Sequence, residues 1–222
     1  MGIISVEQTD RLYWLGRYSE RVYTTLKLFA DSFDQMIDAQ EGAYDGFCKK
    51  LEIPNIYTSR EDFIERYCFD PEDPNSIYSN LMRTYDNAVV LREEIGSETL
   101  SYIQLAVYEM NRARESSAPL IWLQKVTDNI VAFWGMADDC IESENVRNLI
   151  KTGKQVERID LYARLQYDLE KIEREICRLT GRIVRTNLKY DAAKLQNLGE
   201  LIEKDPIDYW QIVYDVESLL EE

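Results

Sequence analysis

Apolar residues recur at alternating spacings of three and four near the start of the chain, and this spacing restricts the fold more than any other feature. The stripe consists of Leu12, Leu15, Ser19, Val22, Leu26, Phe29, Phe33 and Met36. It places apolar side chains on one face of a helix, so we predict a long helix over residues 5–40 with the stripe in the core. Similar spacing returns along the chain, and only five prolines and nine glycines interrupt it. We therefore predict an all-α fold with essentially no β-sheet.

Cap and turn residues divide the rest of the chain. We expect a loop with one short turn of structure over residues 42–58, then a helix that Ser59 caps. An exposed turn over residues 70–75 precedes a helix that runs from Ser76 to about Ile95, because Asp-Pro steps cannot continue a helix. Further helical patterns cover residues 98–114, begin at Pro119 and cover residues 192–204 and 207–220. Another runs from Asn145 to about Tyr167 and continues through Leu179 to a break near Gly181 or Asn187. No linker is evident, so we expect a single domain over residues 1–222.

The chain contains no histidine, which removes whole classes of chemistry. Without imidazole there is no Ser-His or Cys-His nucleophile, no histidine-ligated zinc and no Glu-x-x-His di-iron site. We expect no bound metal and no cofactor. The cysteines are scattered without a Cys-x-x-Cys pair, which is typical of reduced thiols in a cytoplasmic protein. They are Cys48, Cys68, Cys140 and Cys177.

The chain is strongly acidic. It has 26 Lys and Arg against 41 Asp and Glu, a net charge of −15, which repels phosphate backbones and anionic lipids. Nucleic acid and membranes are therefore not expected as partners. No apolar run approaches the roughly 18 residues of a membrane span, and the first ten residues lack the pattern of a leader. We expect a cytoplasmic protein, and the sequence indicates no oligomeric state.

A segment of the first helix returns later in the chain. Residues 16–28 reappear as residues 153–165, an offset of 153 − 16 = 137 residues, with the Gly, Glu, Arg and final Leu identical. We interpret the two segments as pseudo-repeated long helices in equivalent places of one bundle. The polar positions of the repeat are Arg17, Glu20 and Arg21 in the first copy and Lys154, Glu157 and Arg158 in the second.

The repeated Glu and Arg lie outside the apolar stripe, which leaves two alternatives. They form either a solvated face or a polar cluster inside the bundle. Trp14 and Leu28 lie seven residues before and after Arg21, about two helical turns on each side. These apolar neighbours favour burial of Arg21. Gly16 and Gly153 also favour it, because a glycine inside a helix is useful where another backbone or a ligand approaches.

An interior cluster would carry a surplus of positive charge, since the repeat supplies four basic and two acidic groups. Such a surplus can hold a phosphate or carboxylate ligand. An acidic side chain from elsewhere in the chain can also balance it. The candidates for this role are Glu93, Glu94 and Glu109.

Two further blocks accompany the repeat and point to a family. Residues 13–21, Tyr-Trp-Leu-Gly-Arg-Tyr-Ser-Glu-Arg, resemble the opening signature of the bacterial alpha-E proteins, all-helical proteins named for a recurrent Glu-Arg motif. Residues 69–93 resemble that family's central block, although the turn here reads Asp-Pro-Asn-Ser-Ile. With the second Glu-Arg helix, the resemblance covers most of residues 5–165, and residues 170–222 are interpreted from helical pattern alone.

The resemblance implies an association rather than a reaction. Proteins of this family are typically encoded beside ATP-grasp amide ligases and transglutaminase-like proteins, and no catalytic residues are agreed for them. We therefore expect a non-catalytic helical partner of an ATP-grasp-type ligase in peptide synthesis or modification. Two alternatives stay open: an enzyme or anion binder that uses the Glu-Arg cluster, and a purely structural bundle. The predicted docking loop contains Asp73, Asn75 and Ser76.

Overall fold

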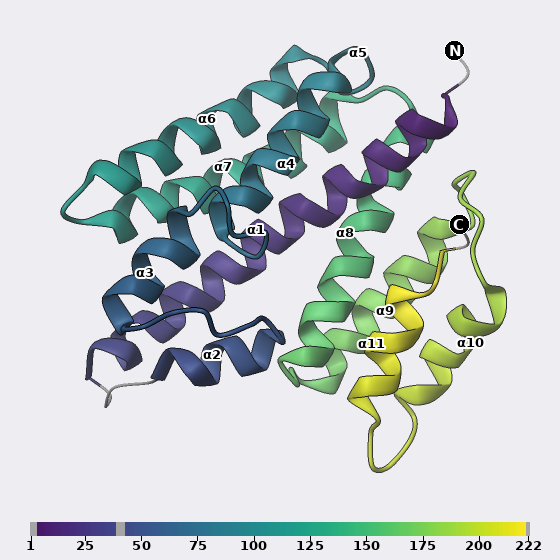
Figure 1. Cartoon of the computed structure of the whole chain (residues 1–222). Coiled ribbons are helices and arrows are strands. Elements are labelled where there is room, and N and C mark those ends of the chain that lie inside the picture. Colours follow the sequence, from purple (N-terminus) through teal and green to yellow (C-terminus); the bar gives the residue numbers. More distant parts are fainter. Residues whose placement is uncertain (1–3, 39–42, 221–222) are drawn as a thin grey trace. The chain divides into compact units, whose positions relative to one another are not determined.

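The computed structural model describes the backbone of residues 4–38 and 43–220 (Figure 1). Within these ranges the chain forms eleven helices and no strand. An isolated antiparallel bridge joins Tyr190 to Leu220. The predicted all-α fold is confirmed.

The chain folds into two compact units. The terminal unit consists of residues 1–20 and 143–222, and the central unit consists of residues 21–142. Helix α1 (Val6–Asp38) contributes its first turns to the terminal unit and its later turns to the central unit. The expected single domain over residues 1–222 stays a prediction.

The terminal unit is organised around α8 (Glu144–Arg164), on which α9 (Leu169–Ile183) and α11 (Tyr209–Glu217) pack. Helix α10 (Ala192–Leu201) packs on α9 and α11 (green and yellow in Figure 1). The chain turns between α8 and α9 at Gln166, whose φ is 50°. The continuous helical pattern predicted over residues 145–179 is therefore two helices.

Apolar side chains from every helix of this unit meet in one core. Burying them drives folding with roughly 25 cal/mol per Å² of apolar surface removed from water. The fully buried members include Val156 and Ile159 of α8, Leu179 of α9, Leu198 of α10 and Ile212 of α11.

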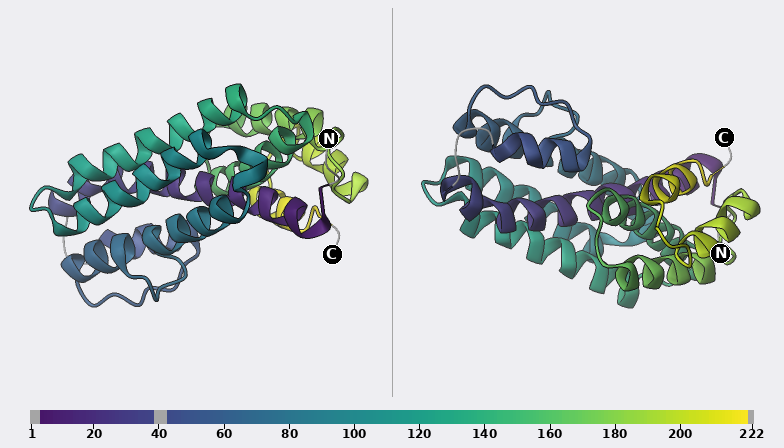
Figure 2. Two further views of the ribbon diagram at one scale, coloured as in Figure 1. Left: turned by 90° about the horizontal axis from the view of Figure 1, so that it is seen from above. Right: turned by 90° about the horizontal axis from the view of Figure 1, so that it is seen from below.

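The central unit contains six helices besides the later turns of α1. Helices α6 and α7 lie side by side and run in opposite directions, α4 packs on α6, and α3 packs on α4 (Figure 2). The helices are α2 (Ala43–Leu51), α3 (Arg60–Phe69), α4 (Ile77–Val90), α5 (Arg92–Ile95), α6 (Ser97–Glu115) and α7 (Pro119–Cys140).

Most helix ends of the central unit lie where the sequence predicts them. Ser59 accepts a hydrogen bond from the backbone N–H of Asp62 at 3.1 Å and caps α3. Pro119 occupies the first turn of α7, where a missing N–H costs nothing. Gly96 follows α5 with a φ of 80°, a left-handed conformation that suits glycine.

The loop predicted over residues 42–58 is wrong in its first part, because α2 forms there. Phe47, Cys48 and Leu51 are buried, and their spacing of one and three residues gives a short helix an apolar face. Residues 39–42 lie outside the described ranges, so the predicted end of the first helix near residue 40 is not tested.

Candidate functional site

Helices α1 and α8 meet at Gly16 and Gly153. A methyl group on Gly16 would lie 1.9 Å from the carbonyl oxygen of Ile150, and one on Gly153 would lie 1.9 Å from the carbonyl oxygen of Tyr13. Both distances are far inside van der Waals contact, so each glycine touches the backbone of the opposite helix. Only a residue without a side chain fits either position.

One turn beyond this crossing, the two helices exchange ion pairs. Arg17 Nε donates to Glu157 Oε2 at 2.7 Å. Arg158 donates from Nε and Nη2 to the two carboxylate oxygens of Glu20, at 2.7 and 2.8 Å. The second pair is bidentate, the strongest geometry that an Arg-carboxylate pair adopts.

Both glutamates are fully buried, with exposed fractions of 0% for Glu20 and 0% for Glu157. Of the two alternatives, the structure therefore shows the polar cluster inside the protein and not the solvated face. It brings Arg17, Glu20, Glu157 and Arg158 together in the terminal unit. Arg21 and Lys154 are half-buried on the same two helices.

Two acidic residues that sequence reasoning missed complete the cluster. Glu175 of α9 lies 3.7 Å from Arg158 and accepts a hydrogen bond from Arg178 at 2.6 Å. Asp160 accepts from Arg164 Nε at 2.8 Å, and Nη2 of the same guanidinium donates to Glu217 of α11 at 2.7 Å. We refer to the ion pairs of Arg17, Glu20, Glu157, Arg158, Asp160, Arg164 and Glu175 as the Glu-Arg cluster.

The predicted surplus of positive charge is therefore offset by carboxylates other than Glu93, Glu94 and Glu109, the three that the sequence suggested. Asp160 and Glu175 take this place, and their exposed fractions are 1% and 4%. Glu93 is exposed, and Glu94 and Glu109 are half-buried in the central unit. Asp160 follows Glu157 by three residues, so the helical period puts both side chains on the same face of α8, and this spacing was a usable signal.

Burial and neighbouring charges shift the acid-base properties of the cluster. Burial raises the pKa of the Asp160 carboxyl to about 6, and repulsion from Glu157 adds to this, while Arg164 acts in the opposite direction. Burial alone would lower the pKa of the Arg158 guanidinium, but the attraction of Glu20 outweighs it and raises the pKa. The arginines therefore stay charged, and Asp160 is the group that titrates near neutral pH.

We expect the substitution Asp160→Asn to favour the folded state increasingly as the pH rises. The carboxyl has a pKa of about 6 in the folded chain, against about 3.9 when unfolded, so the folded state holds its proton more tightly. Its contribution to stability is complete below pH 4 and is lost as the pH rises through 6. Between these pH values, the free energy of unfolding of the variant should rise relative to that of the wild type by on the order of 1–3 kcal/mol. Urea unfolding across this range measures the difference, and a constant difference would contradict the prediction.

The predicted docking loop is largely a structural turn. The prediction that it is exposed is wrong for Asp73 and Ser76, whose exposed fractions are 5% and 0%. Asp73 accepts a hydrogen bond from the Tyr57 hydroxyl at 2.9 Å, and Ser76 caps α4 by accepting from the N–H of Ser79 at 3.0 Å. Asn75 is half-buried. Short polar side chains suit caps as well as docking, and here they cap.

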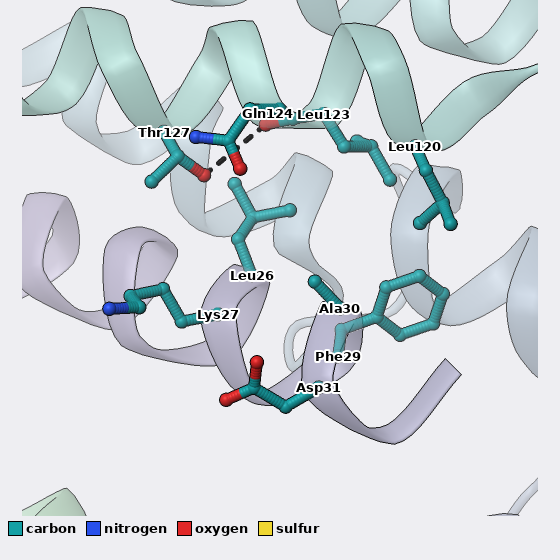
Figure 3. Close-up of a pocket in the computed structure, with 9 residues that line it drawn as sticks. All are labelled: Leu26, Lys27, Phe29, Ala30, Asp31, Leu120, Leu123, Gln124 and Thr127. Carbon is teal, nitrogen blue, oxygen red and sulfur yellow. Dashed lines mark hydrogen bonds between the residues drawn. The ribbon is translucent and has the colours of Figure 1, made fainter. Parts of the chain in front are cut away.

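The central unit holds a small cavity of about 210 Å³ between α1 and α7 (Figure 3). Most of the side chains that line it are apolar. The hydroxyl of Thr127 donates a hydrogen bond to the backbone carbonyl of Leu123 at 3.2 Å. This mostly apolar lining fits an apolar group. The residues around it are Leu26, Lys27, Phe29, Ala30, Asp31, Leu120, Leu123, Gln124 and Thr127.

Among the described residues, no group of three or more His, Cys, Asp or Glu side chains is arranged to hold a metal ion. Over the same residues, no helix combines the length and the apolar character needed to cross a membrane.

Burial distinguishes the glutamates of the two crossing helices from those of the other Glu-Arg dipeptides. Residues 65–66 and 173–174 are also Glu-Arg, but Glu65 and Glu173 are exposed. The fold and the site therefore define an all-helical protein in which two Glu-Arg helices cross at glycines and bind each other's charges. A family described as a predicted alpha-helical domain with a conserved ER motif, Alpha-E, matches residues 8–168, and the chain belongs to this family. No curated protein and no solved structure matches the chain.

Family membership confirms the resemblance noted in the sequence. The origin of α1 and α8 as copies of one repeat stays a prediction, although their glycines and glutamates occupy reciprocal positions at the crossing.

Proposed function

We propose that the chain is a non-catalytic helical partner of an ATP-grasp-type amide ligase in peptide synthesis or modification. The supporting observation is that the acid-base groups of its most distinctive site are occupied in buried ion pairs. Glu20 and Glu157 have exposed fractions of 0%, and each is bonded to a guanidinium of the opposite helix. A general acid or base has to reach the substrate, and these carboxylates do not reach the surface.

The nature of the partner is taken from the family resemblance, and a transglutaminase-like protein is the second partner of this kind. We place the complex in the cytoplasm, where ATP is available to a ligase. The free thiols support this location: the structure contains no disulfide among the described cysteines, and Cys140 and Cys177 are exposed.

A reconstituted ligation assay tests the proposal. The purified chain is added in increasing amounts to the ATP-grasp-type ligase of the same organism, and amide product and ADP are measured. We expect the rate to rise until the two proteins are equimolar, and the two proteins to elute together from a sizing column. Serum albumin at equal concentration is the control and should leave the rate unchanged. A ligase that is indifferent to the chain in both measurements would show the proposal to be wrong.

A second candidate function, an enzyme or anion binder, is favoured by one observation. Asp160 is buried within an arginine-rich cluster and has a pKa of about 6, and such poised groups are enriched at functional sites. Calorimetric titration with inorganic phosphate distinguishes this candidate. Binding that is lost in Arg17→Gln would support it, whereas no heat of binding in the wild type would exclude phosphate as its ligand.

A further inference from the structure

The indole of Trp122, in the first turn of α7, has two cations close to its ring. Arg112 Cζ lies 4.1 Å from the ring centroid of Trp122, and Lys125 Nζ lies 4.0 Å from the same centroid. Trp122 Nε1 donates to Ser116 Oγ at 3.1 Å, which fixes the orientation of the ring. The ring therefore holds two positive charges at one place on the surface.

Neither cation is neutralised by a carboxylate. Among the described residues, no carboxylate lies within ion-pair distance of Arg112 or Lys125, although the chain has 41 acidic residues against 26 basic ones. Other cations of the same unit are paired: exposed Lys49 lies 2.6 Å from Asp45, and half-buried Arg60 lies 2.8 Å from Glu61. Residues 112–125 contain three basic and one acidic residue, so this segment is locally positive in an acidic protein.

Exposed apolar surface lies beside these charges. Tyr108 and Ile121 have exposed fractions of 54% and 63%. Tyr108 stands one turn before Arg112 on α6, and Arg112 Cζ lies 5.6 Å from its ring. Ile121 stands one turn before Lys125 on α7, on the same face of the helix. We call Tyr108, Arg112, Ile121, Trp122 and Lys125 the cationic patch.

We propose that the cationic patch binds an acidic, carboxylate-bearing segment of a partner polypeptide. Arg112 Nη1 donates to the Tyr108 hydroxyl at 3.4 Å. The donors at the Nε and Nη2 edge of the guanidinium remain, so Arg112 can still bind a carboxylate with two hydrogen bonds. Lys125 provides a second charge for a neighbouring carboxylate, and Tyr108 and Ile121 cover the apolar part of the segment. This inference rests on the proposed partner function and gives it a surface.

The test uses the full-length chain labelled with ¹⁵N and a synthetic peptide of eight glutamates as the probe. We expect the indole N–H signal of Trp122 to shift on addition of octaglutamate and to saturate, whereas octaglutamine leaves it in place. Trp122→Phe assigns the signal. The double substitution Arg112→Gln with Lys125→Gln should weaken binding about tenfold, the change that corresponds to about 1.4 kcal/mol.

A matched control separates local recognition from general charge. Lys49→Gln with Arg60→Gln removes the same charge from the same unit, but from cations that already have carboxylate partners. It should change the affinity for octaglutamate by less than about twofold, since exposed ion pairs of this kind contribute little. Equal weakening by the two double substitutions would overturn the proposal.

Two further outcomes would also overturn it. One is a Trp122 signal that does not respond to octaglutamate. The other is a signal that responds only to a thymidine octanucleotide, which would make nucleic acid the occupant. Because the experiment contains no ligase, its failure and the failure of the ligation assay are distinguishable.

Discussion

Gly16→Ala is expected to lower the free energy of unfolding by about 3 kcal/mol or more, at the upper end of the cost of overpacking. The added methyl group would lie 1.9 Å from the carbonyl oxygen of Ile150, an atom of the opposite backbone that cannot rotate away. The two helices would have to separate, and their separation would lengthen the bond between Arg17 and Glu157 as well. Denaturant unfolding followed by circular dichroism measures the effect.

Gly181→Ala is the matched control for this prediction. Gly181 lies in α9 of the same unit, and a methyl group there meets nothing within 4 Å. Alanine should therefore stabilise the chain by about 0.5–1 kcal/mol through its better helix propensity. If Gly16→Ala were as well tolerated as Gly181→Ala, the close crossing of α1 and α8 would be wrong.

The parts of the fold that were predictable are those that depend on local sequence. The stripe that contains Leu12, Leu15 and Val22 follows the period of a helix, and all three residues have exposed fractions of 0%. Caps such as Ser59 act within one turn of the chain, so neighbouring residues are enough to recognise them. Helix α2 was missed because glycines in and before it suggest a loop, whereas the burial of Phe47 in tertiary contacts decides the outcome.

The Glu-Arg cluster was predictable only in part. The repeat indicated which residues belong together, because two copies of one pattern carry information that a single Glu-Arg dipeptide does not. Which arginine binds which glutamate was not readable, since the pairing of Arg17 with Glu157 depends on the geometry of the crossing. Glu175 was missed for another reason: carboxylates are so common in this chain that burial alone distinguishes it.

The cationic patch shows a different limit of sequence reasoning. Arg112 and Trp122 lie on different helices, and the loop between α6 and α7 brings them together. A count of charges over the whole chain gives −15 and hides a local positive segment. Partner chemistry that composition disfavours over the whole surface can therefore be favourable at one place on it.

Arg158→Ala is expected to destabilise the folded chain by about 3–5 kcal/mol, the cost of removing one partner of a buried ion pair. The guanidinium makes two hydrogen bonds to Glu20, whose exposed fraction is 0%. The two hydrogen bonds that the substitution removes are therefore made to a carboxylate that the folded chain keeps from solvent. Lys49→Ala serves as the exposed counterpart, because the pair with Asp45 is open to solvent, and should cost under about 1 kcal/mol.

A double substitution separates the stranded charge from the loss of packing. Glu20→Leu with Arg158→Met removes both charges and keeps most of the volume, and such replacements of buried ion pairs are often neutral or stabilising. It should therefore be more stable than Arg158→Ala alone by about 2 kcal/mol or more. If instead Arg158→Ala left the free energy of unfolding unchanged but abolished support of the ligase, the cluster would serve binding. Alternatively, Arg158→Ala could lower both the free energy of unfolding and the support of the ligase, and the double substitution could restore both. The cluster would then act by holding α1 against α8, which is the role that a non-catalytic partner requires of it.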